Sequence, residues 1–221
     1  MPVAPRECRA RVSAVRTLAP DVLEVDLDLT EPPALAFEAG QWVSVPFGPK
    51  QVRAYSIASS PRAGERLTLC ADVAPDGMGS RWFRELTPGS EVRFKGALGG
   101  FVMPASETRT PLFVAEEIGV VPIRALINEL AAGRAATLVY GAPDSRRPYS
   151  AEFRERARRD AAFAYHPVSE ADLLAEVERL GPDHAAGVAY VAGGEGTIKR
   201  VREVLMARGL SRKAIKWERF W

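Results

Sequence analysis

Apolar and polar residues alternate along the first half of the chain, which is the pattern of strands with one buried face. The alternation is clearest at residues 23–29, 67–73 and 92–95. Proline and glycine separate these runs, as they do between the strands of antiparallel sheets. One short helix is expected at 80–86. The pattern therefore predicts an antiparallel β-barrel.

The second half has a different pattern, in which continuous apolar runs alternate with segments of helical spacing. Buried strands are predicted at 112–115, 136–140, 161–165 and 188–191, with a helix after each. Ile215, Trp217 and Arg219 alternate with their neighbours and predict a final edge strand. Alternating strands and helices are typical of a doubly wound parallel sheet.

A short polar link at 104–109 separates the two patterns. We therefore expect two domains, a β-barrel domain over 1–105 and an α/β domain over 106–221.

Composition narrows the function classes. The net charge of +2, from 30 basic and 28 acidic residues, predicts no nucleic-acid partner. No apolar run approaches the ~20 residues of a membrane span. The cysteines Cys8 and Cys70 are not paired in a C-x-x-C motif, so we expect no metal site and a reducing, cytoplasmic setting. His166 and His184 are the only histidines, which leaves little for a Ser-His-Asp hydrolase.

The segment Arg53-Ala54-Tyr55-Ser56 places a cation, an aromatic ring and a hydroxyl on one β-prone stretch. Residues two apart share a face of a strand, so Arg53 and Tyr55 are expected side by side. A guanidinium suits a phosphate oxygen, and a flat ring suits a second flat ring. The alternative is an edge strand with an exposed arginine and a half-buried tyrosine.

The turn Gly77-Met78-Gly79-Ser80 opens the predicted helix of the first half. Glycine lets a ligand approach the backbone, and a helix N-terminus attracts anions. Ser80 either caps the helix or bonds a phosphate oxygen. Together with Arg53, the turn predicts a clamp on a pyrophosphate; a capped turn without ligand is the alternative.

These motifs resemble those of the ferredoxin–NADP reductase family, and they occur in the family's order. They lie at 53–56, 71–80, 96–101, 118–124, 190–194 and 218–221. The resemblance implies a flavin-binding β-barrel domain over 1–105 and an NAD(P)-binding-like α/β domain over 106–221. It favours FAD as the cofactor, with FMN as the alternative. It implies that Tyr55 packs on the isoalloxazine, that Ser56 bonds its polar edge, and that Trp221 covers the flavin face where a nicotinamide docks.

The resemblance also implies further cofactor contacts. The backbone at 70–73, including Asp72 and Val73, is expected to contact the flavin, and Gly119 belongs to the nucleotide loop. Tyr55, Ser56 and Trp221 are the expected catalytic residues.

The chain departs from the family pattern where the nucleotide would bind. Glu116 and Glu117 replace two glycines of the family pattern. A carboxylate 4 Å from a nucleotide phosphate would repel it by ~1 to 4 kcal/mol and weaken nucleotide binding. The alternative is that both carboxylates turn to solvent. Glu170 stands where the family often has an arginine for the 2′-phosphate, and Ala192 replaces a cysteine.

Arg146 and Arg147 could substitute for the missing arginine, although exposed loop arginines are more commonly solvated.

Two functions follow from these observations. The first is a flavin-dependent oxidoreductase that passes electrons between a weakly bound NADH or NADPH and a protein or small-molecule acceptor. The alternative is a flavin-binding electron-transfer subunit that no longer uses a pyridine nucleotide. Gly119 and Pro122 favour the first, whereas Glu116, Glu117, Glu170 and Ala192 favour the second. A redox protein is the expected partner in either case.

Overall fold

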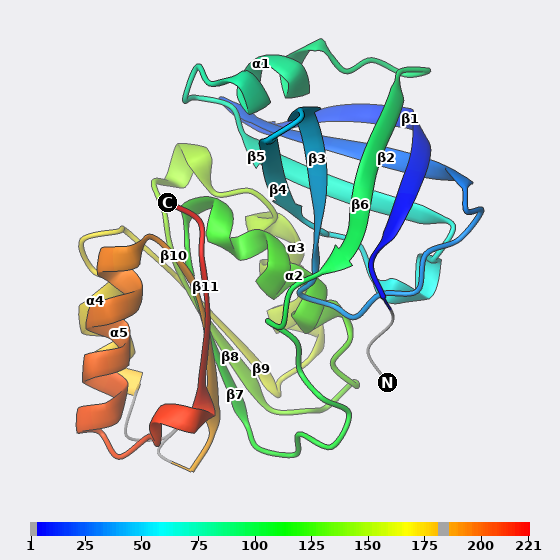
Figure 1. Ribbon diagram of the computed structural model, residues 1–221. Coiled ribbons are helices and arrows are strands. Elements are labelled where there is room, and N and C mark those ends of the chain that lie inside the picture. The colour runs from blue at the N-terminus through cyan, green and yellow to red at the C-terminus, as the bar shows by residue number, and fades with distance from the viewer. Residues whose placement is uncertain (1–3, 181–185) are drawn as a thin grey trace. The chain divides into compact units, whose positions relative to one another are not determined.

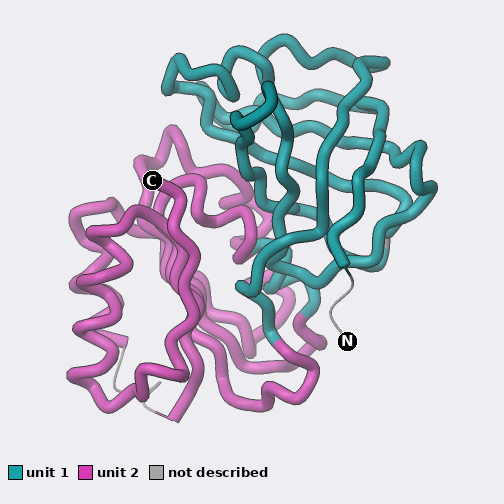
Figure 2. Tube along the Cα trace, in the orientation of Figure 1, with its two compact units in different colours: residues 1–103, 124–129 teal, residues 104–123, 130–221 magenta. Residues whose placement is uncertain are grey.

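The computed structural model describes residues 4–180 and 186–221. The chain forms two compact units, shown in Figure 2. Unit 1 comprises Met1–Met103 and Arg124–Glu129, and unit 2 comprises Pro104–Ile123 and Leu130–Trp221. The first break falls at the start of the polar link at 104–109. His184 lies outside the described residues.

Unit 1 is an antiparallel β structure with one short helix (Figure 1). Its strands are β1 (Arg6–Ala19), β2 (Val22–Glu31), β3 (Trp42–Gly48), β4 (Gln51–Ser56), β5 (Arg66–Asp72) and β6 (Glu91–Leu98), and its helix is α1 (Met78–Glu85). The sheet order is β4-β3-β6-β1-β2-β5. A single bridge between Ile57 and Leu69 links the two edges of this sheet, so it closes on itself as a barrel.

The barrel core comes from the alternation noted in the sequence. Leu67, Leu69 and Val73 are buried along or just beyond β5, and Val92 and Phe94 are buried in β6. These side chains belong to one apolar cluster, because every second residue of each strand points inward.

Glu24 is an exception to the alternation, since it is buried within β2. The β1–β2 pair contains register shifts, which displace side chains from strict alternation. The Glu24 carboxylate is paired with Arg16, whose Nη2 lies 2.7 Å from Glu24 Oε1. The pair satisfies a charge that burial would otherwise make costly.

Unit 2 is a parallel sheet with helices on its faces (Figure 1). Its strands are β7 (Pro111–Glu116), β8 (Ala136–Gly141), β9 (Phe163–Val168), β10 (Val188–Gly193) and β11 (Ile215–Arg219). The helices are α2 (Val120–Asn128), α3 (Ser150–Arg159), α4 (Leu173–Leu180) and α5 (Glu195–Ala207), and the last residues of α2 group with unit 1. The doubly wound parallel sheet predicted from the sequence is confirmed.

The helices α4 and α5 lie side by side on one face of this sheet, and α3 lies on the other (Figure 1). Leu173 and Val177 of α4 and Ile198 and Val201 of α5 pack with Val191 of β10 in one cluster. On the α3 side, the rings of Phe153 and Tyr165 have centroids 5.5 Å apart. Both faces are therefore covered, as a parallel sheet requires.

The strand order β11-β10-β7-β8-β9 contains a change of direction. From β7 the chain adds β8 and β9 on one side, then crosses over to add β10 and β11 on the other. The point where the order reverses thus lies between the carboxyl ends of β7 and β10. In open α/β sheets, ligands bind at this switch point.

Candidate functional site

Arg53 and Tyr55 lie on the same face of β4, as the sequence predicted, and both reach Gly79 in α1. The Tyr55 hydroxyl donates a hydrogen bond to the Gly79 carbonyl at 3.3 Å. A Cβ atom on Gly79 would lie 2.7 Å from the Tyr55 hydroxyl and 3.2 Å from Arg53 Cγ. Gly79 is therefore required by the contact between α1 and β4, independently of any ligand.

The Tyr55 ring packs against α1. Its centroid lies 5.6 Å from that of Trp82 and 5.4 Å from that of Phe83. Only 9% of the residue is exposed, and burial raises the pKa of its hydroxyl to about 12. The hydroxyl is therefore neutral at physiological pH and acts as a hydrogen-bond donor. The stacking of Tyr55 on a flavin stays a prediction.

Arg53 is exposed, and its guanidinium donates to the carbonyl of its neighbour Val52 at 2.9 Å. Within residues 4–180 and 186–221, no carboxylate forms an ion pair with Arg53. Ala54 is exposed between Arg53 and Tyr55, and Ser56 is buried at the end of β4 opposite Trp42. Arg53 thus offers an uncompensated cation beside the glycine turn.

The turn at 77–80 differs from the prediction in its helix cap. Gly77 is the N-cap of α1, so Ser80 lies inside the first turn, and of the two alternatives for Ser80 the helix cap is wrong. The helix begins two residues early, at Met78, because Gly77 adopts the extended cap conformation without a side chain. Nothing lies within 4 Å of a Cβ on Gly77, so this side of the turn is open.

The backbone expected to contact a cofactor at Asp72 and Val73 is used inside unit 1. The Asp72 carboxylate accepts from the Ala74 N–H at 2.9 Å. The Val73 N–H donates to the Asp21 carbonyl at 2.7 Å, and its carbonyl accepts from Arg84 at 2.5 Å. Arg84 was not singled out in the sequence, and a lone arginine in a short helix carries no signal that would single it out.

Glu116 ends β7 at the switch point, and its carboxylate is bound to the first turn of α5. Its Oε2 accepts from the Gly194 N–H at 2.8 Å, and its Oε1 accepts from the Thr197 hydroxyl at 2.6 Å. For Glu116, the alternative that the carboxylate turns to solvent is therefore wrong. Thr197 was missed from the sequence because it lies 81 residues from its partner.

Glu117 has a different environment. Its φ of 45° is in the left-handed region, which is unusual for a residue with a side chain. Its Oε1 lies 3.9 Å from Arg146 Nη1, and its side chain is 27% exposed. Glu117 thus points toward the loop after β8 rather than freely into solvent.

Arg147, expected as a solvated loop residue, is buried. Its guanidinium donates to the carbonyls of Ala142 and Val168 and forms an ion pair with Asp144. The guanidinium carbon also lies 5.9 Å from the Tyr140 ring centroid. Solvation was the wrong expectation because these acceptors satisfy the cation internally, and Arg147 is not free for a 2′-phosphate.

Gly119 and Gly194 mark two close approaches of the chain. A Cβ on Gly119 would lie 2.4 Å from the Ala192 carbonyl oxygen, and one on Gly194 would lie 2.5 Å from Trp221 Nε1. Trp221 is 53% exposed, and its carbonyl accepts from the Glu195 N–H at 3.3 Å. The indole is therefore held at the start of α5; its placement over a flavin stays a prediction.

Glu218 of β11 was not identified from the sequence. Its Oε2 is buried without a hydrogen-bond partner in the described part of the chain, and burial raises the pKa of its carboxyl to about 7. Glu170, in contrast, is exposed before α4.

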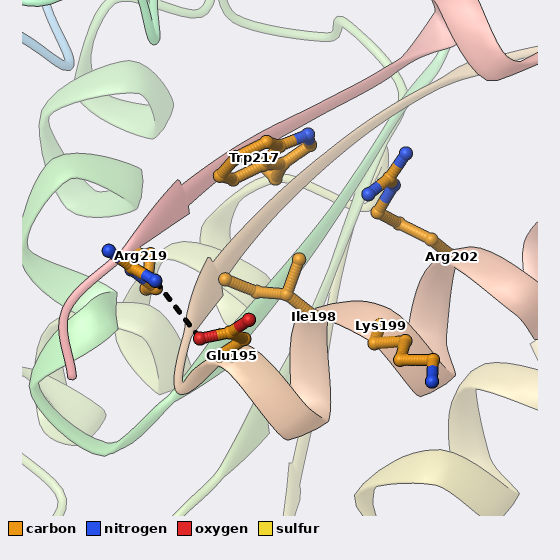
Figure 3. Close-up of a pocket in the computed structure, with 6 residues that line it drawn as sticks. All are labelled: Glu195, Ile198, Lys199, Arg202, Trp217 and Arg219. Carbon is orange, nitrogen blue, oxygen red and sulfur yellow. Dashed lines mark hydrogen bonds and ion pairs between the residues drawn. The ribbon is translucent and has the colours of Figure 1, made fainter.

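A pocket of about 430 Å³ lies in unit 2 between α5 and β11 (Figure 3). It is lined by Glu195, Ile198, Lys199, Arg202, Trp217 and Arg219. The guanidinium carbon of Arg202 lies 5.7 Å from the Trp217 ring centroid, and Arg219 lies 2.9 Å from the Glu195 carboxylate. Two of the three cations in the pocket, Arg202 and Arg219, thus have partners. None of the predicted flavin-binding residues lines this pocket.

Metal and membrane features can be judged for the described residues alone. Among them, no cluster of three or more His, Cys, Asp or Glu side chains could hold a metal ion. His166 lies 2.8 Å from the Glu176 carboxylate, and both cysteines are buried and form no disulfide. None of the described helices is long and apolar enough to cross a membrane.

Comparisons with known proteins match both halves of the chain. Residues 9–103 match the oxidoreductase FAD-binding domain family, and residues 108–221 match the siderophore-interacting protein family. The chain is 39% identical over 133 residues to ferredoxin–NADP reductase B of Sorangium cellulosum, covering 58% of this chain and 54% of that protein. It is 29% identical over 144 residues to the reductase component 1 of terephthalate 1,2-dioxygenase from Comamonas, and the match covers 64% of this chain and 43% of that protein.

Among solved structures, the Amycolatopsis cytochrome P450 reductase GcoB superposes with a TM-score of 0.84. The match is 24% identical and covers 98% of this chain and 70% of that one, which shows the same fold. The chain spans about half the length of the curated relatives it matches first, namely 54%, 43% and 43%.

Proposed function

Because the chain belongs to the ferredoxin reductase-like flavoproteins, with a FAD-binding domain followed by a siderophore-interacting-protein-type domain, we propose that it is a FAD-dependent oxidoreductase. The family and the two-domain fold expected from the sequence are thereby confirmed, and FAD agrees with the matched domain. When bound, FAD supplies the redox chemistry, accepting a hydride from a reduced nicotinamide and releasing electrons singly. The protein's part is to hold and orient it.

The observation that carries this proposal is the cation of Arg53 beside the glycine turn. The guanidinium is exposed and bonded only to the Val52 carbonyl among the described residues. The open side of Gly77 leads to the N-terminus of α1, where backbone N–H groups favour an anion. These groups fit the diphosphate of FAD, which Arg53 and the turn at 77–80 would hold.

We also propose that a redox protein receives the electrons. The relatives include the reductase component of a dioxygenase, an enzyme system in which reductase and oxygenase are separate components. The two-unit chain, which spans part of such relatives, would supply the flavin step and leave the acceptor to another protein or domain.

Purified protein tests the cofactor assignment directly. It should be yellow, or become so on incubation with FAD. Arg53→Ala should bind FAD about ten- to a hundredfold more weakly, because a charge-assisted hydrogen bond contributes roughly 1.5 to 3 kcal/mol. Arg93→Ala, which removes another exposed arginine of unit 1, should leave FAD affinity unchanged. Protein that stays colourless with added FAD refutes the proposal.

A second function, electron transfer without a pyridine nucleotide, is favoured by one observation. The Glu116 carboxylate lies at the switch point, where a nucleotide would bring its own negative charge. Anaerobic mixing with NADH and with NADPH separates the two functions. Bleaching of the flavin absorbance by either nucleotide supports the oxidoreductase. A flavin that only dithionite or a reduced protein can bleach supports the second function.

A further inference from the structure

The first turn of α5 already holds an anion, and that anion belongs to the protein. α5 has 13 residues, and its N-cap, Gly194, has no side chain with which to cap it. The Glu116 carboxylate fills that role from 78 residues away, by accepting from the Gly194 N–H at 2.8 Å. Its other oxygen accepts from the Thr197 hydroxyl at 2.6 Å. Both carboxylate oxygens are therefore bound.

This contact is built tightly into the fold. A Cβ on Gly193 would lie 2.7 Å from Glu116 Cβ, and one on Gly194 would lie 3.2 Å from Glu116 Oε2. Glycine at 193 is needed to admit the glutamate side chain, and a side chain at 194 would press on its carboxylate. The last residue of β7 and the start of α5 are thus fitted to each other at the carboxyl edge of the sheet.

The electrostatics of the position explain why a carboxylate suits it. The N-terminus of a long helix carries a partial positive charge and unpaired N–H groups, and it attracts anions such as phosphate. A carboxylate bound there offsets that charge and takes the Gly194 N–H. A phosphate arriving at the switch point meets a negative charge and a Gly194 N–H that is already bonded.

We propose that Glu116 is a specificity-determining residue. Its carboxylate occupies the N-terminus of α5 at the switch point, which we call the anion position. Phosphate-bearing ligands therefore bind there only in competition with this carboxylate. The assignment rests on the proposed function in one respect: the phosphate-bearing ligand that competes with Glu116 is the nicotinamide nucleotide that reduces the flavin. The occupation itself rests on the two hydrogen bonds alone.

Glu117 provides a matched control. It has the same charge and the next position in the chain, but its carboxylate lies near Arg146, in the segment that follows β8. Glu116→Ala and Glu117→Ala change the net charge equally, so a general effect of charge on anion binding appears in both. An effect confined to Glu116→Ala reports the anion position.

The experiment is calorimetric titration of the full chain with inorganic pyrophosphate. Removing one carboxylate about 4 Å from a bound anion should raise the affinity for that anion by roughly five- to several-hundredfold. Glu116→Ala should therefore bind pyrophosphate at least about fivefold more tightly than the unaltered protein, while Glu117→Ala stays within about twofold of it. Thr197→Val, which frees one carboxylate oxygen, should give a smaller gain than Glu116→Ala.

Two results would overturn the assignment. One is no gain in pyrophosphate affinity in a Glu116→Ala protein with a native circular dichroism spectrum, and the other is an equal gain in Glu117→Ala. If Glu116→Ala does not fold, Glu116→Gln replaces it, with Glu117→Gln as control. The absence of a gain over that control then overturns the assignment.

The pyrophosphate titration needs neither flavin nor activity, so its outcome is independent of the proposed function. A colourless protein whose Glu116→Ala variant gains pyrophosphate binding refutes the oxidoreductase and supports the Glu116 assignment. If the protein is yellow and NADH bleaches it, but Glu116→Ala gains no pyrophosphate affinity, the oxidoreductase is supported and the Glu116 assignment is refuted.

Discussion

Replacing Glu218 by glutamine should remove a loss of stability that the protein suffers as the pH rises. Glu218 lies on the edge strand β11, opposite Ala192 of β10. Its side chain is half-buried, and Oε2 is fully buried with no hydrogen-bond partner among the described residues. An ionised carboxylate in that position loses hydration without gaining a compensating bond.

The size of the effect follows from the pKa of Glu218, which burial raises from 4.5 to about 7. Below pH 4.5 the carboxyl is protonated in both the folded and the unfolded chain, and it costs nothing. As the pH rises toward 7 the unfolded chain ionises first, so the free energy of unfolding falls; above pH 7 the loss is complete. The full loss is at most about 3 kcal/mol, since one pKa unit corresponds to about 1.36 kcal/mol.

Urea unfolding followed by circular dichroism, with saturating FAD throughout, measures this loss. Glu218→Gln should match the unaltered protein at about pH 4 and exceed its free energy of unfolding at about pH 8, by up to about 3 kcal/mol. Glu203→Gln removes an exposed carboxylate of α5 and serves as control. A difference between Glu218→Gln and the unaltered protein that does not grow with pH refutes the reasoning.

Two further substitutions test the candidate site. Gly79→Ala places a Cβ 2.7 Å from the Tyr55 hydroxyl, so it should weaken FAD retention and lower the free energy of unfolding by about 1 to 3 kcal/mol. Gly77→Ala, with nothing within 4 Å, should lower the free energy of unfolding far less; an equal loss of stability contradicts this argument. Trp221→Ala should raise flavin fluorescence and speed reduction by NADH, whereas Trp217→Ala should do neither. Unchanged fluorescence in Trp221→Ala counts against stacking on the flavin.

The sequence predicted those elements whose buried face consists of large apolar residues. β2, β5 and β6 in unit 1 and every strand of the parallel sheet were expected close to where they occur. β1 was missed because its inward residues Cys8, Ala10 and Val12 are small and alternate with charges. β3 was missed because Pro46 interrupts it.

The candidate site was predictable where it depends on residues two apart on one strand. Arg53 and Tyr55 share a face because of strand geometry alone, and their common contact with Gly79 follows from the turn that comes after β5. Contacts made across long stretches of chain left no such trace. The acceptors that bury Arg147 include Val168, 21 residues away, and periodicity carries no information about that pairing.

Glycine at the switch point shows why a motif needs its neighbours before it can be interpreted. Gly119, Gly193 and Gly194 match the positions at which a nucleotide-binding chain keeps its backbone bare, and a bare backbone alone indicates an approaching phosphate. In this protein the space beside them is filled by the Ala192 carbonyl, the Glu116 side chain and the Trp221 indole. The glycines are required by those contacts, whatever ligand binds. The informative residue is therefore Glu116, because among the groups that fill this space its carboxylate is the one that carries a charge.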